Sequence, residues 1–258
     1  MTAHEDIAFM TGSKVRIDVL LALRSTTATP TALAEECSCA RETAQRTVSA
    51  FVDRGWAEKV STDDGYRLTR AGELVAESYE EFESCIEVSD RFRKFLANLR
   101  GSAPDLDCAL LSEATAATAT AENPHAPIDR FLAVVGDGTV ETFRGITPIV
   151  SRVFNRAAGR VIGPESEVEL IVDRDVLSAS ASEYPDALDR AEELAGFRLL
   201  ISQEPLEFGV MIIDGHAYVG AYDDEGNLVA SADSDDEAFV GWAERTFERI
   251  RDDAEAWS

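Results

Sequence analysis

The chain has 258 residues, of which 45% are apolar, and a net charge of −25. The apolar fraction excludes intrinsic disorder as the cause of this acidity, and the length suits two modest domains. The basic residues are 21 arginines and only three lysines. This composition is typical of a protein that stays hydrated in concentrated salt, so the acidity indicates a halophilic setting more than a cationic partner.

No segment resembles a secretion signal or a membrane span. The N-terminal residues are acidic, and no apolar run approaches the roughly 20 residues that a bilayer requires. We therefore expect a cytoplasmic protein without a membrane partner, with all four cysteines reduced. Cys37 and Cys39 lack the second ligand pair of a zinc site. They are a candidate redox pair, although the plain role of Cys39 is that of a small buried apolar residue.

Residues 13–70 are the one near-neutral part of the chain. Between residues 10 and 75, nine Lys/Arg balance nine Asp/Glu. A neutral module in so acidic a chain indicates the part that approaches a polyanion, which points to DNA. The pattern predicts helices over 13–24, 32–36 and 41–54, then strands over 56–60 and 66–69 on either side of an Asp-Gly turn at 62–65.

The third helix, over residues 41–54, has two chemically different faces. Ala44, Val48 and Phe51 recur at i, i+4 and i+7 and predict the buried face, and Gly55 predicts a left-handed cap after the helix. The opposite face carries side chains that can read base edges and hold phosphates, namely Arg41, Glu42, Thr43, Gln45, Arg46 and Ser49.

The hairpin over residues 56–69 adds two cations, Lys59 and Arg67, which are expected to meet backbone phosphate. A longer pattern runs through both helix and hairpin, on Leu33-Ala34, Arg41, Thr43, Arg46, Val48, Arg54-Gly55-Trp56, Tyr66, Leu68, Thr69 and Gly72. This pattern resembles archaeal and bacterial winged-helix repressors. The resemblance implies a winged helix-turn-helix that binds double-stranded DNA, with residues 41–54 in the major groove. The alternative is an adaptor that binds another protein through the same module.

Residues 73–100 predict one long helix, or two in line. Val75, Tyr79, Phe82 and Ile86 have heptad spacing, and an apolar face continues after a phase shift near Ser89. This seam can pack on the winged helix, but pairing with a second copy is favoured because winged helices usually read two-fold related half-sites. We expect a homodimer that buries Tyr79, Phe82, Ile86 and Phe92.

The second half of the chain predicts an α/β pattern, after a break at 101–104 and an Ala/Thr-rich run at 114–122. Residues 130–135 are a strand or a helix end. Helices are expected over 145–158, 185–195 and 235–254, and strands over 167–172, 197–202, 208–214, 217–222 and 227–232. The expected class is α+β. It comprises a winged helix-turn-helix at 1–75, a connecting and dimerisation helix at 76–104, and a C-terminal α/β regulatory domain with a small mixed sheet at 105–258.

This half contains several short motifs that are informative about its family. They are the loop 123–127 before Ile128 to Phe131, the strand Val168 to Val172, Ala230-Ser231, and the segment from Asp235 to Phe247. These motifs are similar to the C-terminal domain of methanogenesis-regulator-type transcription factors, including relatives in halophiles. The resemblance implies a transcription regulator whose second domain senses an effector or assembles the dimer.

Two residues beside the loop 123–127 are a candidate effector site. His125 and Arg130 could meet an anionic metabolite, although the plainer role of Arg130 is an ion pair with one of the many acids. No histidine stands with a nucleophile pattern, and the turn glycines lack the Lys and Ser/Thr of a phosphate loop. We expect no catalytic residue, no cofactor and no metal site. A thiol-responsive regulator that uses Cys37 and Cys39 stays a further alternative.

Overall fold

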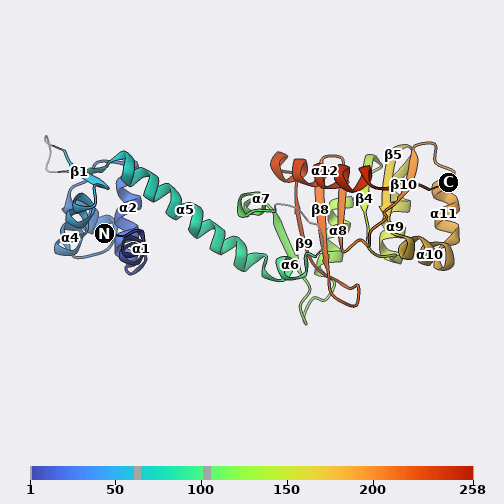
Figure 1. The fold of residues 1–258 in the computed structure, drawn as a ribbon, viewed down its shortest axis with the longest axis horizontal. Coiled ribbons are helices and arrows are strands. Elements are labelled where there is room, and N and C mark those ends of the chain that lie inside the picture. Colours follow the sequence, from blue (N-terminus) through green and yellow to red (C-terminus); the bar gives the residue numbers. More distant parts are fainter. Residues whose placement is uncertain (1, 61–64, 101–105, 258) are drawn as a thin grey trace. The chain divides into compact units, whose positions relative to one another are not determined.

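The structure is a computed structural model, and it describes residues 2–60, 65–100 and 106–257. The chain divides into two compact units, Met1–Ser84 and Cys85–Ser258 (Figure 1). One helix, α5 (Arg70–Arg91), runs through the boundary between them. Among the described residues, no helix combines the length and the apolar character that a membrane span requires.

The N-terminal unit is a bundle of short helices followed by a small hairpin. Its elements are α1 (Ala3–Thr11), α2 (Lys14–Ser25), α3 (Pro30–Glu36), α4 (Arg41–Asp53), β1 (Ala57–Lys59) and β2 (Tyr66–Leu68). The strands β1 and β2 pair antiparallel with Glu58 opposite Arg67, and Ala28 adds a bridge to Tyr66. Most of the turn predicted at 62–65 lies outside the described residues. The predicted order of three helices and two strands is confirmed, and Gly55 has the expected positive φ of 72°.

The sequence prediction missed α1, which closes the core of this unit. Phe9 from α1 lies edge-on to Phe51 of α4, with 6.2 Å between ring centroids, and it also contacts Trp56. The guanidinium of Arg54 lies 3.7 Å from the Phe9 ring centroid and donates to Asp6 at 3.0 Å. Phe51 is fully buried. The end of α4 is thus held by aromatic packing, a cation–π contact and an ion pair.

Gly72 allows the start of α5 to lie directly on the turn that follows α4. A Cβ atom at this position would overlap the carbonyl oxygen of Trp56. Thr69 strengthens the same junction, because its amide donates to the Trp56 carbonyl at 2.9 Å and its hydroxyl donates to the Gly55 carbonyl at 2.6 Å. The glycine in the sequence pattern therefore serves close packing of backbone on backbone.

The C-terminal unit is built on a mixed sheet with the strand order β10-β6-β5-β4-β7-β8-β9-β3. The pairs β4–β5 and β5–β6 are parallel, and the other pairs are antiparallel. The strands are β3 (Thr115–Thr118), β4 (Val140–Ile146), β5 (Ile162–Val172), β6 (Phe197–Ile201), β7 (Phe208–Ile213), β8 (His216–Tyr222), β9 (Leu228–Ser234) and β10 (Glu255–Ala256).

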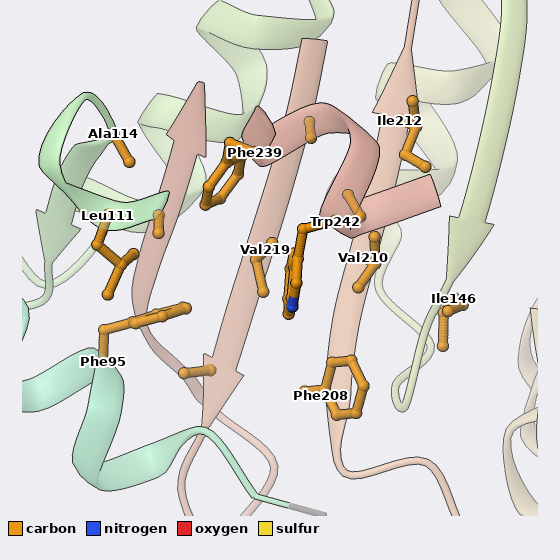
Figure 2. Packing of buried hydrophobic residues seen from close by; sticks show 14 of the residues in the cluster. Phe95, Leu111, Ala114, Ile146, Phe208, Val210, Ile212, Val219, Phe239 and Trp242 are labelled. Atoms are coloured by element: carbon orange, nitrogen blue, oxygen red, sulfur yellow. The ribbon is translucent and has the colours of Figure 1, made fainter. Parts of the chain in front are cut away.

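Helices cover both faces of this sheet, so the unit has three layers. All six residues of β7 are buried, as expected of a strand that is covered on both sides. On one face, Trp242 of the last helix lies between Val210 and Val219 (Figure 2). On the other face, Phe131 packs edge-on to Phe154 with a centroid distance of 4.6 Å. The helices of the unit are α6 (Arg93–Asn98), α7 (Cys108–Ser112), α8 (Ala126–Val135), α9 (Arg152–Val161), α10 (Arg174–Glu183), α11 (Pro185–Glu192) and α12 (Glu237–Asp252).

The predicted α+β class is confirmed, but several predicted elements differ. The sheet has eight strands among the described residues, so it is larger than the small sheet expected. The helix predicted over 145–158 begins only at Arg152, because Gly145 and Ile146 belong to β4 and pair with β5 and β7. Residues 130–135 are helical. The Ala/Thr-rich run at 114–122 contains β3, which pairs with β9.

The prediction that the apolar side of residues 75–99 pairs with a second copy is wrong for the second part of this range. Phe92 and Phe95 are fully buried in the core of the C-terminal unit. Phe92 therefore cannot be buried against a second copy. Phe82 and Ile86 remain 59% and 53% exposed. A heptad pattern records only that one side of a helix is apolar, and an intramolecular core satisfies it as well as a partner does.

The expectation that all four cysteines are reduced is wrong for two of them. Cys85 of α5 and Cys108 of α7 form a disulfide, with their Cα atoms 5.2 Å apart. The packing of Leu111 beside Val88 and Phe92 in one core brings the two helices together. This proximity depends on tertiary packing across 23 residues of chain. Cys37 and Cys39 are free thiols.

Truncating Phe51 tests the aromatic cluster that holds α4. Phe51→Ala should lower the free energy of unfolding by about 3 to 5 kcal/mol, because it leaves a cavity against Phe9 and Trp56. Chemical denaturation followed by circular dichroism measures the change. The neighbouring Val52 is 40% exposed, so Val52→Ala should stay within about 0.5 kcal/mol of the wild type. Equal losses for the two variants would contradict the described packing.

Candidate functional site

Helix α4 presents a polar face opposite its buried one. Ala44, Val48 and Phe51 are fully buried as predicted, and Thr47, which the sequence did not single out, is buried with them. The six predicted contact residues point away from this core. Arg41, Glu42, Arg46 and Ser49 are exposed, and Thr43 and Gln45 are half-buried.

Internal hydrogen bonds order part of this face. The amide nitrogen Nε2 of Gln45 donates to the Tyr66 hydroxyl of β2 and to Ser49 Oγ, both at 3.3 Å. Nε of Arg46 donates to the Glu42 carbonyl of its own helix, also at 3.3 Å. The Gln45 contact links α4 to the hairpin, so the helix and β2 offer one continuous polar surface.

The hairpin carries its two predicted cations in different surroundings. Arg67 donates from Nε to Glu58 Oε1 at 2.7 Å, across the pair of strands. Both side chains are about half exposed, so solvent screens this pair. Lys59 is exposed one residue along from Glu58. The charge of Arg67 is therefore partly balanced within the hairpin before any partner binds.

The turn between α3 and α4 holds Cys37 and Cys39 as half-buried free thiols. Burial, with a smaller contribution from the neighbouring Cys39, raises the pKa of Cys37 to about 11. A thiol with so high a pKa is protonated near neutral pH, whereas the thiolate is the reactive form. The local chemistry therefore favours a packing role for Cys37 over a redox role.

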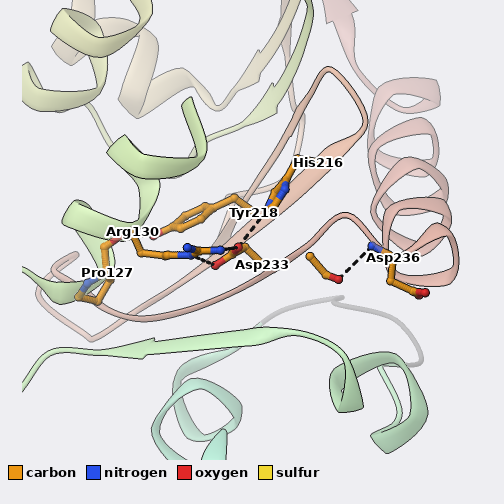
Figure 3. A network of polar contacts seen from close by, with 7 residues as sticks. Pro127, Arg130, His216, Tyr218, Asp233 and Asp236 are labelled. Atoms are coloured by element: carbon orange, nitrogen blue, oxygen red, sulfur yellow. Dashed lines mark hydrogen bonds and ion pairs between the residues drawn. The ribbon is translucent and has the colours of Figure 1, made fainter. Parts of the chain in front are cut away.

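In the C-terminal unit, a buried carboxylate joins an arginine and a histidine. Asp233 of β9 has no exposed surface. It accepts from Arg130 of α8, through Nε at 2.7 Å and Nη2 at 2.5 Å, and lies 2.9 Å from Nε2 of His216 on β8 (Figure 3). The hydrogen bond to Asp233 raises the pKa of Arg130 above its usual value. Tyr218 fixes α8 to the same strands, because its hydroxyl donates to the Pro127 carbonyl at 2.8 Å.

The structure separates the two predicted effector residues. Arg130 is engaged by Asp233, which agrees with its plainer role as an ion-pair partner, whereas His125 is an exposed residue at the start of α8. His216, which the sequence analysis did not single out, is the second side chain that contacts Asp233. The sequence offered no sign of this triad, because Arg130 and Asp233 are 103 residues apart. One open groove, of about 700 Å³, lies elsewhere, along α12 beside Arg144 and Arg245.

Metal chemistry finds no support in the described parts of the chain. Over residues 2–60, 65–100 and 106–257, no group of three or more His, Cys, Asp or Glu side chains could hold a metal ion. The features of the two units are instead a helix with an exposed polar face, an adjoining hairpin and a three-layer unit with a buried ion-pair cluster. They define a winged helix-turn-helix protein with an α/β companion domain.

Two family models match this chain. Residues 124–253 match the model described as the methanogenesis regulatory protein FilR1, middle domain, and residues 4–91 match the HVO_A0261 N-terminal domain. The first match spans half of the chain, so the protein belongs to the family of the FilR1 middle domain. It is a transcriptional regulator of the winged-helix type, and the family predicted from the sequence motifs is confirmed.

Solved structures show more distant similarity. The archaeal chromatin protein TrmBL2 has 12% identity and a TM-score of 0.41, over 95% of this chain and 94% of that one. The reduced form of MarR from E. coli has 18% identity and a TM-score of 0.25, over 31% of this chain and 72% of that one. FabT from Streptococcus pneumoniae, solved in complex with DNA, has 14% identity and a TM-score of 0.27, over 37% and 71%. A search of curated proteins found no match.

Neutralising Asp233 tests the ion-pair cluster. Asp233→Asn should lower the free energy of unfolding by about 3 kcal/mol, because it leaves Arg130 without its buried counter-charge. We place the loss at the lower end for such pairs because the Arg130 side chain keeps some contact with solvent. Thermal or denaturant unfolding measures it. Asp137, which is 97% exposed, is the matched control, and Asp137→Asn should leave stability unchanged. A neutral effect at Asp233 would show that the cluster adds nothing to stability.

Proposed function

We propose that the protein is a sequence-specific DNA-binding transcriptional regulator that acts in the cytoplasm. Helix α4 enters the major groove and its exposed side chains contact base edges, while the β1–β2 hairpin lies on the phosphate backbone. The C-terminal unit regulates this binding, by sensing an effector or by assembling the dimer, and carries out no chemistry on a substrate.

The exposed polar face of α4 carries this proposal. Arg41 and Arg46 are donors suited to guanine, and Gln45 is suited to adenine. They share one face of a single helix, and the buried face fixes its orientation. The local balance of charge supports the same partner, because residues 10–75 are neutral in a chain with a net charge of −25. A surface without net negative charge can approach DNA without long-range repulsion.

Two substitutions separate base reading from phosphate contact. Arg46→Ala should weaken binding to the preferred operator by about 1 to 3 kcal/mol and relax specificity at one base pair. Lys59→Ala should weaken binding to all sequences alike and lower the salt dependence of the binding constant by about one ion. Fluorescence anisotropy with the operator and with random duplex, over a series of KCl concentrations, measures both effects.

The control for this experiment is Arg93→Ala, which removes the same charge from an exposed residue of α6 that pairs with Asp90. It should leave DNA binding unchanged. The adaptor alternative makes a different forecast for the same face. If Arg46→Ala leaves occupancy of DNA in cells intact but removes a co-purifying protein, the winged helix binds a protein and the proposal fails.

We also propose that the regulator is a homodimer that pairs through α5. The support is a solvent-exposed stretch of this helix, since residues 81–84 are all exposed over a full turn. Phe82 and Ile86, four residues apart, place two large apolar side chains on one side of this stretch. Exposed apolar pairs of this kind commonly mark a protein interface. A two-fold dimer would require an imperfect palindrome, with half-sites one duplex turn, roughly 34 Å, apart.

Introducing charge into this pair tests the dimer. The double variant Phe82→Glu, Ile86→Glu should convert the dimer into a monomer at micromolar concentration, because it places like charges in the apolar contact. Multi-angle light scattering gives the mass directly. Leu96→Glu changes a 38% exposed residue of α6 and should leave the mass unchanged. A double variant that stays dimeric would place the interface elsewhere, and a monomeric wild type would remove the dimer altogether.

A further inference from the structure

The disulfide between Cys85 and Cys108 joins α5 to α7 directly after an exposed stretch of α5. Their Cα separation of 5.2 Å is within the range that a disulfide requires. Both residues are half-buried. Neither cysteine is sealed inside the core, which exchange with a small thiol or disulfide requires.

The bond fastens one end of α7, and separate contacts fasten the other. Cys108 is the first residue of this helix. At the far end, Nη2 of Arg91 donates to the carbonyls of Leu111 and Ser112, at 2.8 and 2.6 Å. Leu111 is also buried in the core. The C-terminal end of α7 is thus held without sulfur chemistry, whereas its first residue is tied covalently to α5.

On α5, the bond sets where the helix is first held by the C-terminal unit. The preceding residues 81–84 are exposed on every side, as are Ile86 and Glu87. The next buried side chain is Val88. With the disulfide, α5 is anchored from Cys85. Without it, the covalent hold is gone and the buried packing starts at Val88, so in a single copy of the chain residues 81–87 form nearly two turns of solvated helix. Short unsupported helical segments are marginally stable in water, so this stretch bends and frays more readily.

We propose that Cys85 and Cys108 form a thiol–disulfide switch that sets the rigidity of α5 and thereby the affinity of the regulator for a two-half-site operator. The oxidant is a small-molecule disulfide. One cysteine thiolate attacks a sulfur of this molecule, which releases one small thiol and leaves a mixed disulfide on the protein. The second cysteine then attacks the protein sulfur of the mixed disulfide and releases the second small thiol. The two cysteines lose two electrons, and the small disulfide gains them together with the two protons.

The link to DNA rests on the proposed function and on pairing through Phe82 and Ile86. Pairing needs a regular helix at 81–87, because only then do Phe82 and Ile86 share one side of α5. When this stretch frays, pairing weakens and fewer molecules present two copies of α4, so the second half-site binds less often as an intramolecular step. The oxidised protein should therefore bind the two-half-site operator more tightly than the reduced one. A single half-site should not distinguish between the two states.

The first test counts thiols and does not involve DNA. The full-length protein is equilibrated with oxidised or reduced glutathione, quenched in acid, unfolded and alkylated, and its mass and disulfide peptides are measured. The oxidised form should show two thiols, Cys37 and Cys39, and the reduced form four. Hydrogen exchange should be faster at residues 81–88 in the reduced form. Four thiols under both conditions, or identical exchange at 81–88, would overturn the switch.

The second test measures DNA binding in both redox states. Reduction should weaken binding to the two-half-site operator by about tenfold and leave the single half-site unchanged. Cys85→Ser, Cys108→Ser should bind like the reduced wild type under both conditions. The matched control Cys37→Ser, Cys39→Ser should keep the full response. A response that persists without Cys85 and Cys108, or that vanishes without Cys37 and Cys39, would overturn the proposal.

The two tests also separate this switch from the proposed function. If redox state changes the thiol count and the exchange at residues 81–88 but neither state binds DNA, the regulator function fails while the switch in α5 stands. If both states bind the operator equally, the link from α5 to DNA fails while the regulator function stands.

Discussion

The contact between Phe9, Phe51 and Trp56 is the constraint on which the exposed polar face of α4 depends. A helix can present a defined polar face only if its other face is held in one orientation. The stacked guanidinium of Arg54 closes this cluster from the end of α4. A rotation of α4 by one residue would expose Phe51 and turn Gln45 away from Tyr66. Burial of one side of the helix thereby specifies which side chains face outward.

Charge is arranged in the two units by different means. In the winged helix, opposite charges meet at the surface in pairs such as Arg67 with Glu58, where solvent screens them. In the C-terminal unit, Asp233 is buried away from solvent and contacts Arg130 and His216. The first arrangement leaves cations available for exchange with a polyanion. The second rigidly joins α8 to β8 and β9, since a buried carboxylate tolerates little change in its partners.

The sequence predicted those features that repeat along a single element. The spacing of Ala44, Val48 and Phe51 is local, and it correctly separated the buried and exposed faces of α4. The family motifs are likewise short stretches of neighbouring residues, and they correctly indicated the family. Helix α1 was missed because only Met10 is fully buried in it, so its pattern is weak.

Features made by tertiary packing were beyond this kind of prediction. The sequence cannot show that Phe92 faces its own core, since a partner helix would require the same residue. It also cannot bring His216 to Asp233, or Cys85 to Cys108, before the order of strands and helices is known. The boundary between β4 and α9 was misplaced because an apolar central strand and an apolar helix start have the same composition.

The position of β3 in the sheet has a consequence for the order in which the chain acquires structure. This strand pairs with β9, and Thr115 lies opposite Asp233. The hydrogen bonds between the two strands therefore cannot form until the chain has been made as far as β9. The winged helix contains only contacts within the first 84 residues and forms quickly from local pairings. During synthesis from the N-terminus, the winged helix is therefore complete while the sheet still lacks its last strands. A ribosome-bound chain passes through a stage with a folded winged helix and an unfinished C-terminal unit.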